Sequence, residues 1–335
     1  MIPAAVVAAY GWDDAELHAV TGGLINATYR VTRGAPIAAV QRLHKIFGAE
    51  VNLDIEAVTA HLAARGMTTP RLIRTLDDRA WVEVDGEIWR ALTWLDGRTV
   101  HAVPEPAWAE AGGELVGRFH RAVADLQHDY AFARAGVHDT AAHLARLADF
   151  VVASADAEAV ELGRDVLAAA AGLPELVTTR RRHCHGDLKI SNLVFGEPLH
   201  GLALVDLDTL GLGTLAFELG DAMRSWCNPS GEDAGSVLFD LPIFAAAIRG
   251  FRSVADPIVT PGERASIVSG LETVCIELAA RFAVDVFRDD YFGWDPARFP
   301  SRRAHNLIRA RGQLTLALAV RAARSDALDL VLTGS

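Results

Sequence analysis

The alternation of hydrophobic and polar residues divides the chain into two parts. From residue 17 to about residue 94, apolar side chains occur in short runs that alternate with polar ones, and glycine-containing turns separate these runs. This pattern predicts strands over residues 25–31, 37–43, 80–84 and 87–95. One helix is predicted in this part, over residues 53–64, and Gly66 follows it where a helix C-terminus favours glycine.

From residue 105 onward the apolar positions follow the helical period. Helices are predicted over residues 108–126, 141–152, 157–170, 241–251, 267–287 and 304–323. A polar segment, residues 183–208, interrupts them with loop and short-strand character. The first residues are predicted to form a short helix and not a signal peptide, because no basic segment precedes their apolar run. The pattern therefore predicts a small β-rich lobe, a hinge at residues 93–97 and a large helical lobe.

Composition and charge exclude several classes of protein. The chain has 335 residues, of which 51% are hydrophobic, and this is enough for two packed lobes. Its formal net charge of −11 argues against nucleic-acid binding, and charged residues interrupt every apolar stretch that approaches a membrane span. Three widely spaced cysteines, Cys184, Cys227 and Cys275, indicate buried thiols in a reducing compartment. We therefore expect a cytoplasmic monomer or homodimer whose partner is a small molecule.

The polar segment carries the residues that phosphoryl transfer requires. Lys189 and Asn192 follow Asp187 by two and five residues, and Asp206 ends the apolar run of residues 202–205. Protein kinases use an aspartate with an asparagine five residues later, and a second aspartate at the end of a strand. We therefore predict that Asp187 accepts the proton of the attacking hydroxyl and that Lys189 contacts the γ-phosphate of ATP. Asn192 and Asp206 are predicted to bind Mg²⁺.

The alternative for this segment is a loop in which Asp187 and Asn192 only close a turn. Asp208 lies on the same strand-end face as Asp206, and it is predicted to contact the metal or the substrate, or to cap the strand end. Asp221 is predicted to anchor the segment by accepting hydrogen bonds from its backbone.

The strand-rich part is predicted to bind ATP without a loop of the GxxxxGK[ST] type, which the chain lacks. Gly22 and Gly23 allow backbone N–H groups to approach the phosphates, although a plain hairpin explains them equally well. Val40 and Arg42 are predicted to share one strand face, with Val40 on adenine and Arg42 on the phosphates. Glu56 is predicted to pair with Arg42, unless both are solvated surface residues. The predicted nucleotide-binding residues are Gly22, Gly23, Asn26, Thr28, Val40, Arg42, Glu56, Thr93 and Leu95.

At these residues the chain resembles the aminoglycoside phosphotransferase (choline kinase-like) superfamily of small-molecule kinases. The likeness rests on His185-Gly186-Asp187, Asn192 and Asp206. A closer likeness, to the bacterial N-acetylhexosamine 1-kinases, rests on residues 23–29, 40–42, 187–192, 205–209, 220–224, 281–282, 291 and 305–311. The resemblance implies an α+β, two-lobed protein-kinase-like fold, with residues 1–95 as a nucleotide-binding lobe and residues 96–335 as a helical lobe with the catalytic loop and acceptor site.

The resemblance also implies roles for individual residues. Asp187 resembles the base, and Asn192 and Asp206 resemble the magnesium ligands. The residues implied for the sugar are Asp187, Asp208, Thr209, Arg281 and Tyr291. The expected activity is ATP- and Mg²⁺-dependent phosphorylation of a sugar hydroxyl, with the anomeric hydroxyl of an N-acetylhexosamine as the first candidate. Two alternatives stay open: a kinase of an aminoglycoside, a choline-like amine or an amino-alcohol, and a nucleotide-binding regulatory pseudokinase.

Overall fold

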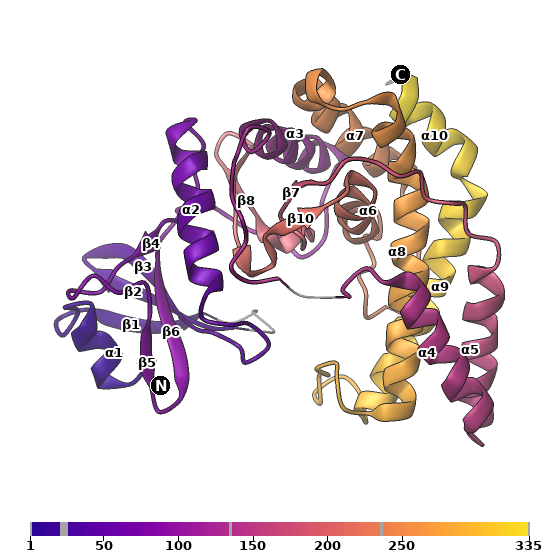
Figure 1. The fold of residues 1–335 in the computed structure, drawn as a ribbon, viewed down its shortest axis with the longest axis horizontal. Helices are drawn as coiled ribbons and strands as arrows, with labels where there is room; N and C mark the ends of the chain where they lie inside the picture. Colours follow the sequence, from indigo (N-terminus) through magenta and orange to yellow (C-terminus); the bar gives the residue numbers. More distant parts are fainter. Residues whose placement is uncertain (1, 21–25, 134–135, 235–236, 334–335) are drawn as a thin grey trace.

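The structure is a computed structural model, and it describes residues 2–20, 26–133, 136–234 and 237–333. It has two lobes, which confirms the predicted α+β architecture (Figure 1). The N-lobe is an antiparallel sheet of β1 (Glu16–Val20), β2 (Ala27–Arg33), β3 (Ala35–Arg42), β4 (Leu72–Ile73), β5 (Val82–Val84) and β6 (Glu87–Thr93). These strands lie in the order β1-β2-β3-β6-β4, and β5 also pairs with β6. Two helices, α1 (Ala4–Ala9) and α2 (Val51–Ala64), accompany the sheet.

The two faces of the N-lobe sheet have different surroundings. Val40 and Trp89 point toward α1, where they belong to a small apolar core of this lobe. Because successive side chains of a strand point to opposite faces, Gln41, Arg90 and Leu92 point the other way. That second face meets α2 and the C-lobe, and Leu92 belongs to the large core that α2 shares with the C-lobe.

The C-lobe is mainly helical. Its helices are α3 (Pro106–Ala122), α4 (Thr140–Ala153), α5 (Ala157–Ala170), α6 (Leu215–Trp226), α7 (Leu241–Ala255), α8 (Pro261–Arg288), α9 (Arg302–Ala322) and α10 (Arg324–Thr333), with short 3₁₀ turns at Ile190–Asn192, Leu207–Thr209 and Asp256–Ile258. Two small sheets carry the polar segment between α5 and α6, pairing β7 (Arg182–Cys184) with β10 (Gly211–Gly213) and β8 (Leu193–Gly196) with β9 (His200–Leu204). Figure 1 shows these strands on the side of the C-lobe that faces the N-lobe.

Helices α6 and α8 approach each other closely at a pair of glycines. A β-carbon on Gly220 would lie 2.7 Å from the backbone of Gly270, closer than a side chain allows. Glycine at both positions therefore lets the two helix backbones come into contact. This contact fixes α6, whose buried Glu218 lies beneath the polar segment.

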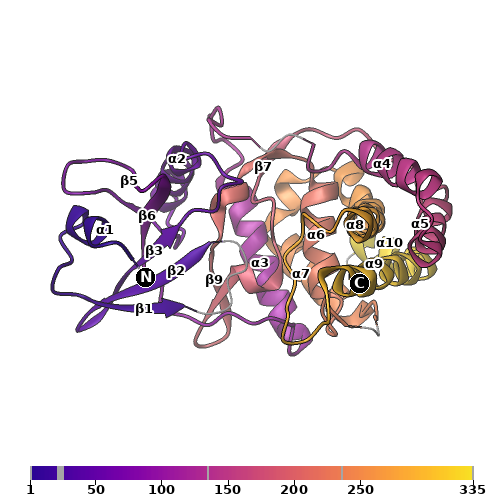
Figure 2. The same ribbon diagram turned by 90° about the horizontal axis from the view of Figure 1, so that it is seen from below.

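Helix α2 joins the two lobes through apolar contacts. Its residues Ile55, Val58 and Leu62 are buried in the same core as Val116 and Phe119 of α3. Figures 1 and 2 show α2 between the N-lobe sheet and the C-lobe. The lobes therefore share one core along α2.

A buried carboxylate on α2 adds a polar contact between the lobes. Asp54 accepts hydrogen bonds from the backbone N–H groups of Ala131 (2.9 Å) and Phe132 (3.0 Å) in the C-lobe. Its Oδ1 also lies 2.8 Å from Nε2 of His128. The first turn of α2 is thus held on the segment that follows α3.

Most predicted elements are present, with shifted ends. The predicted helices of the C-lobe correspond to α3, α4, α5, α7, α8 and α9, and the short N-terminal helix corresponds to α1. The sequence pattern does not predict α6, which carries the buried polar residues Glu218 and Arg224, and it does not predict α10. Among the described residues, no helix is both long and apolar enough to cross a membrane.

Asp54→Ala is expected to lower the free energy of unfolding by about 2–4 kcal/mol, because two N–H groups of the C-lobe lose their acceptor. Urea unfolding measures this change. Asp165→Ala, at an exposed position of α5, is the matched control and should change stability by less than about 0.5 kcal/mol. Equal effects of the two substitutions would show that Asp54 does not help to hold the lobes together.

Candidate active site

A buried carboxylate of α6 holds the loop between β7 and β8. The two oxygens of Glu218 accept hydrogen bonds from the backbone N–H groups of His185 (2.7 Å) and Gly186 (2.9 Å). Burial alone would raise the pKa of Glu218, but His120, 3.4 Å away, and the N–H of His185 bring that pKa below its usual value. The backbone of the loop is therefore held by the ionised carboxylate of Glu218.

The other side of this loop is bound to the segment that follows β9. Nε2 of His185 lies 2.9 Å from the carbonyl oxygen of Val205, and the Thr209 hydroxyl donates to the His185 carbonyl oxygen at 2.8 Å. Gly186 has φ +81°, and a β-carbon there would lie 2.5 Å from the carbonyl oxygen of Thr209. Thr209 stays a prediction for the sugar: its hydroxyl proton closes the loop, and its oxygen keeps the capacity to accept a hydrogen bond.

The structure brings the two predicted catalytic residues and the two predicted metal ligands together. Nζ of Lys189 lies 2.6 Å from Oδ2 of Asp187 and 3.6 Å from Oδ2 of Asp206. Nδ2 of Asn192 donates to the carbonyl oxygen of Asp187 (2.9 Å) and to its Oδ2 (3.1 Å). Burial alone would lower the pKa of Lys189, but the carboxylates of Asp187 and Asp206 outweigh it and raise that pKa. Lys189 is therefore a charged ammonium that orients Asp187.

The β8–β9 hairpin places Asn192 beside Asp206. Leu193 is paired with Leu204, and the N–H of Val205 donates to the carbonyl oxygen of Asn192 at 2.9 Å. Burial raises the pKa of Asp206, and Lys189 opposes this rise. An amide and a carboxylate oxygen at one hairpin end suit Mg²⁺, which takes few protein ligands and keeps its water and phosphate oxygens.

Asp208 does not lie open to a substrate or a metal, so this prediction needs correction. Its side chain is buried, and both oxygens bind the guanidinium of Arg90 in the N-lobe. Asn26, which we predicted for the nucleotide, donates its Nδ2 to Oδ2 of Asp208 at 2.5 Å. Asn26 and Asp208 are therefore bonded to each other across the boundary between the lobes.

The predicted pair of Arg42 and Glu56 is also wrong. Glu56 binds Arg74 with both oxygens, at 2.8 and 2.7 Å, and Arg42 is exposed. Val40 is buried beneath α1, on the sheet face opposite to the C-lobe, so it is not placed for adenine. Gln41 lies on the face that meets the C-lobe. The prediction was therefore wrong by one residue along the strand, which exchanges the two faces.

Three of the remaining nucleotide candidates, Thr28, Thr93 and Leu95, lie at or near the ends of N-lobe strands. Gly22 and Gly23 lie outside the described residues. The Thr28 hydroxyl on β2 accepts a hydrogen bond from Nε2 of Gln41 at 3.1 Å. Thr93 ends β6, where its hydroxyl accepts the N–H of Arg71 at 2.9 Å, and Leu95 follows it, partly exposed.

Asp221 does not anchor the catalytic loop, because the buried carboxylate described above does so. Asp221 instead pairs with Arg224 at 2.9 Å, and Arg224 also pairs with Glu232 at 2.9 Å. Arg309 lies 3.8 Å from Glu232 and donates to the carbonyl oxygen of Gly293 at 2.8 Å. A series of alternating charges thus leads from α6 to the loop that follows α8.

That loop contains Tyr291 and contacts Arg281, two of the five residues predicted for the acceptor. The carboxylate of Asp285, near the end of α8, accepts the backbone N–H groups of residues 290–292 at 2.8 to 3.1 Å. The guanidinium of Arg281 lies over the ring of Phe292, 5.6 Å from its centre. Tyr291 is 56% exposed and its ring packs edge-on against Phe292. Asp285 therefore orders the loop, and Arg281 lies against it.

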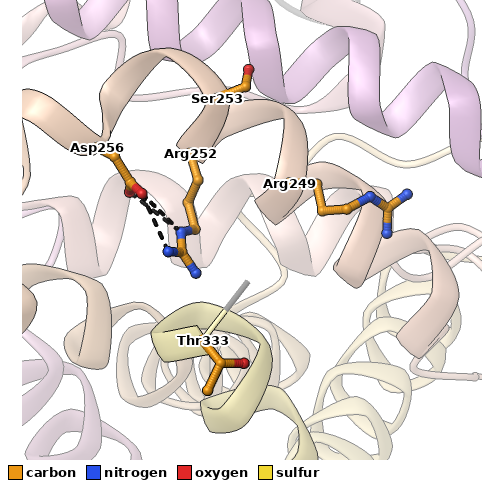
Figure 3. A pocket seen from close by; sticks show the side chains of 5 residues that line it. All are labelled: Arg249, Arg252, Ser253, Asp256 and Thr333. Carbon is orange, nitrogen blue, oxygen red and sulfur yellow. Dashed lines mark hydrogen bonds and ion pairs between the residues drawn. The ribbon is translucent and has the colours of Figure 1, made fainter. Parts of the chain in front are cut away.

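A separate hollow in the C-lobe is lined by Arg249, Arg252, Ser253, Asp256 and Thr333 (Figure 3). Arg252 points toward Asp256 and pairs with it at 3.2 Å. Its Nη1 also donates to the carbonyl oxygen of Val331 in α10, at 3.4 Å. Arg252 thus joins α7 to α10, and we assign no ligand to this hollow.

Comparisons with known proteins agree with the two-lobed fold and identify the family. The model of the phosphotransferase enzyme family (APH) matches residues 16–254. An aminoglycoside phosphotransferase from Alicyclobacillus acidocaldarius is 16% identical, with a TM-score of 0.64 over 98% of this chain and 96% of that one. A microcompartment-associated aminopropanol kinase is 17% identical, with a TM-score of 0.63 over 97% of both chains. An amicoumacin kinase, in complex with AMP-PNP and Ca²⁺, is 14% identical, with a TM-score of 0.61 over 90% of this chain and 87% of that one.

Gly186→Ala is expected to destabilise the protein by about 2–4 kcal/mol, because the new methyl group both strains a left-handed backbone and meets the Thr209 carbonyl. Urea unfolding measures the change. Gly34→Ala is the matched control, since Gly34 has φ +72° but nothing within 4 Å of the added atom. Its cost should be about 1 kcal/mol, and an equal cost at both positions would show that the close contact is not the cause.

Proposed function

The chain belongs to the phosphotransferase enzyme family, and we propose that it transfers the γ-phosphoryl group of Mg²⁺-bound ATP to the anomeric hydroxyl of an N-acetylhexosamine. Its role as a small-molecule phosphotransferase follows from the family. The observation that carries the proposal is the contact of Asp187 with Lys189 and Asn192, at the hairpin end that also presents Asp206.

The proposed base is Asp187. Lys189 and Asn192 both contact its Oδ2, so that oxygen is oriented, and the other oxygen is proposed to accept the hydroxyl proton of the acceptor. The acceptor oxygen then bonds to the γ-phosphorus, while the bond from phosphorus to the bridging oxygen breaks and ADP leaves. An anomeric hydroxyl is more acidic than the other sugar hydroxyls, so one carboxylate suffices to activate it.

Positive charge at the site supports this transfer. The Lys189 ammonium lies between the carboxylates of Asp187 and Asp206, from where it is proposed to reach the transferring phosphoryl group. Asn192 and Asp206 are proposed to hold Mg²⁺, which supplies further neutralisation of the phosphate oxygens when bound.

The lobes are proposed to divide the substrates between them. Residues 1–95 would bind the nucleotide, with Thr93 and Leu95 at the connection between the lobes. Residues 96–335 would bind the acceptor and carry the catalytic loop. The sheet ends at Thr93 and α3 begins at Pro106, so this division falls in the connecting segment.

The acceptor is proposed to contact Arg281 and Tyr291. Glu277, Arg281 and Asp285 are spaced by four residues on α8 and therefore share one helix face. Glu277 accepts the Thr140 hydroxyl at 2.8 Å and lies 3.1 Å from Nδ1 of His138. The two carboxylates thus hold the segments before α4 and after α8, on either side of Arg281.

An amine-bearing acceptor is the second candidate, because an amicoumacin kinase and an aminopropanol kinase share the fold. A cationic acceptor needs a carboxylate or an aromatic surface to bind it. The carboxylates of Glu277 and Asp285 already bind other groups of the protein. The guanidinium of Arg281 suits a neutral ligand rich in hydroxyl and amide groups, so we favour the sugar.

Asp187→Asn is expected to lower turnover by about 10²–10⁴-fold, because the variant lacks the proposed base. Binding of Mg²⁺·ATP should survive, since Asp187 is not assigned to the nucleotide. ADP release with N-acetylglucosamine or N-acetylgalactosamine measures turnover, and calorimetry measures binding. A variant that keeps more than about half of the activity would show that the base is misassigned.

Arg281→Ala is expected to raise KM for the sugar by at least about tenfold and to leave KM for ATP unchanged, because the lost contact belongs to one substrate. Arg311→Ala, which removes an exposed arginine paired with Glu158, is the matched control and should change neither value. Similar rises in both KM values of Arg281→Ala would indicate a general structural role for this arginine.

The product identifies the acceptor and the position of attack. ADP release is screened with free N-acetylhexosamines, aminoglycosides, choline and aminopropanol. In the NMR spectrum of the sugar product, phosphorus coupling to the anomeric proton supports the proposal. Coupling at carbon 6, or turnover restricted to the amines, overturns it.

A further inference from the structure

A buried polar cluster crosses the boundary between the lobes beside the catalytic loop. This interlobe cluster consists of Asn26, Gln41, Asn52, Arg90 and Asp208. We propose that it fixes the lobes relative to each other and thereby positions Asp206 for Mg²⁺·nucleotide binding, with Arg90 and Asp208 as its positioning residues. The inference rests on the proposed function, in which Asn192 and Asp206 hold the metal.

Arg90 is the centre of the cluster. Its two terminal nitrogens bind the two oxygens of Asp208, and the Nη2 to Oδ2 distance is 2.9 Å. Its Nε donates to Oε1 of Gln41 at 2.9 Å, and its Nη1 lies 3.4 Å from Oδ1 of Asn52. The side chains of Arg90 and Asp208 are each 1% exposed. Arg90 therefore connects β6, β3 and α2 of the N-lobe to one carboxylate of the C-lobe.

Asn26 makes the second contact to the same carboxylate. Its Nδ2 donates to Oδ2 of Asp208 at 2.5 Å, and its Oδ1 accepts the backbone N–H of His44 at 2.9 Å. Gln41 extends the cluster to the Thr28 hydroxyl on β2. Of the residues predicted for the nucleotide, Asn26 thus binds Asp208 directly, and Thr28 is linked to it through Gln41 and Arg90.

Asp208 lies close to the proposed metal ligand, Asp206, along the chain. It lies two residues after Asp206, within the single 3₁₀ turn Leu207–Thr209. Asp206 itself has φ 63° and ψ 57°, a left-handed conformation that costs a non-glycine residue free energy and persists only when its surroundings enforce it. β9 fixes the chain before Asp206, and the contact of Asp208 with Arg90 fixes it afterwards. Loss of that contact would let Asp206 relax.

This ion pair fixes the position of one lobe relative to the other and adds little to the free energy of unfolding. A buried ion pair contributes little net stability compared with apolar residues of similar size, because both charges lose their water. A guanidinium bound by two nitrogens to a carboxylate does, however, fix both distance and angle. Kinase-like lobes can close and open around a ligand. A contact that fixes distance and angle at the boundary between the lobes therefore limits this motion.

The test compares the affinity for Mg²⁺·ATP with thermal stability. Asp208→Asn keeps the side-chain shape and removes the charge, and we expect it to raise the Kd for Mg²⁺·ATP at least about fivefold. Its radius of gyration in solution scattering should also increase. Glu272→Gln is the matched control: Glu272 is a buried carboxylate bound by Arg321 and Arg324 within the C-lobe. This control should lower Tm and leave the Kd within about twofold of wild type.

The outcomes separate the inference from the proposed function. An Asp208→Asn protein that binds Mg²⁺·ATP like wild type overturns the inference alone. A wild-type protein that does not bind Mg²⁺·ATP overturns the proposed function, and the inference with it. If Asp208→Asn does not fold, Arg90→Lys replaces it, because lysine keeps the charge and loses the two-nitrogen contact. The same loss of affinity is then expected, and an unchanged Kd again overturns the inference.

Discussion

The contact of Arg90 with Asp208 is the constraint on which the arrangement of the two lobes depends. Apolar contacts along α2 bring the lobes together, but such contacts have no direction and tolerate small rotations. A buried, two-nitrogen ion pair tolerates little rotation, because a displaced partner would leave an unpaired charge out of water. The apolar core therefore determines that the lobes touch, and the ion pair, together with the hydrogen bonds of Asp54, determines how they are oriented next to Asp206.

Within the C-lobe, buried carboxylates fix the loops on which the chemistry depends. Glu218 accepts two N–H groups of the catalytic loop, and Asp285 accepts three N–H groups of the loop after α8. Hydrogen bonds to an ionised acceptor are shorter and stronger than those between neutral groups. Loops held in this way need little rearrangement when a substrate arrives, which favours a preorganised site. Glu218 thus fixes the backbone that precedes Asp187, and Asp285 fixes the backbone of the loop that Arg281 contacts.

Contacts between residues that are close in the sequence are the ones that the sequence predicts best. Asp187, Lys189 and Asn192 lie within one short loop, so their spacing alone places them in contact. The pairing of Arg42 with Glu56 failed because it depends on which of several charged residues lie opposite each other in the folded lobe. Val40 was assigned to the wrong face because a strand pattern gives the alternation of faces without saying which face meets the partner lobe. Glu218 had no local signal, since its partners are backbone groups more than thirty residues away.

Charge pairing also limits what the acceptor region can bind. Between the catalytic loop and the loop after α8, Asp221, Glu232 and Asp233 are each paired with an arginine. A cationic acceptor that used one of these carboxylates would have to displace its arginine, and Arg224 and Arg309 are themselves buried. The displaced guanidinium would then lose one of its partners, which is costly away from water. A neutral acceptor needs only hydrogen bonds to side chains such as Arg281, so the ion pairs can remain intact while it binds.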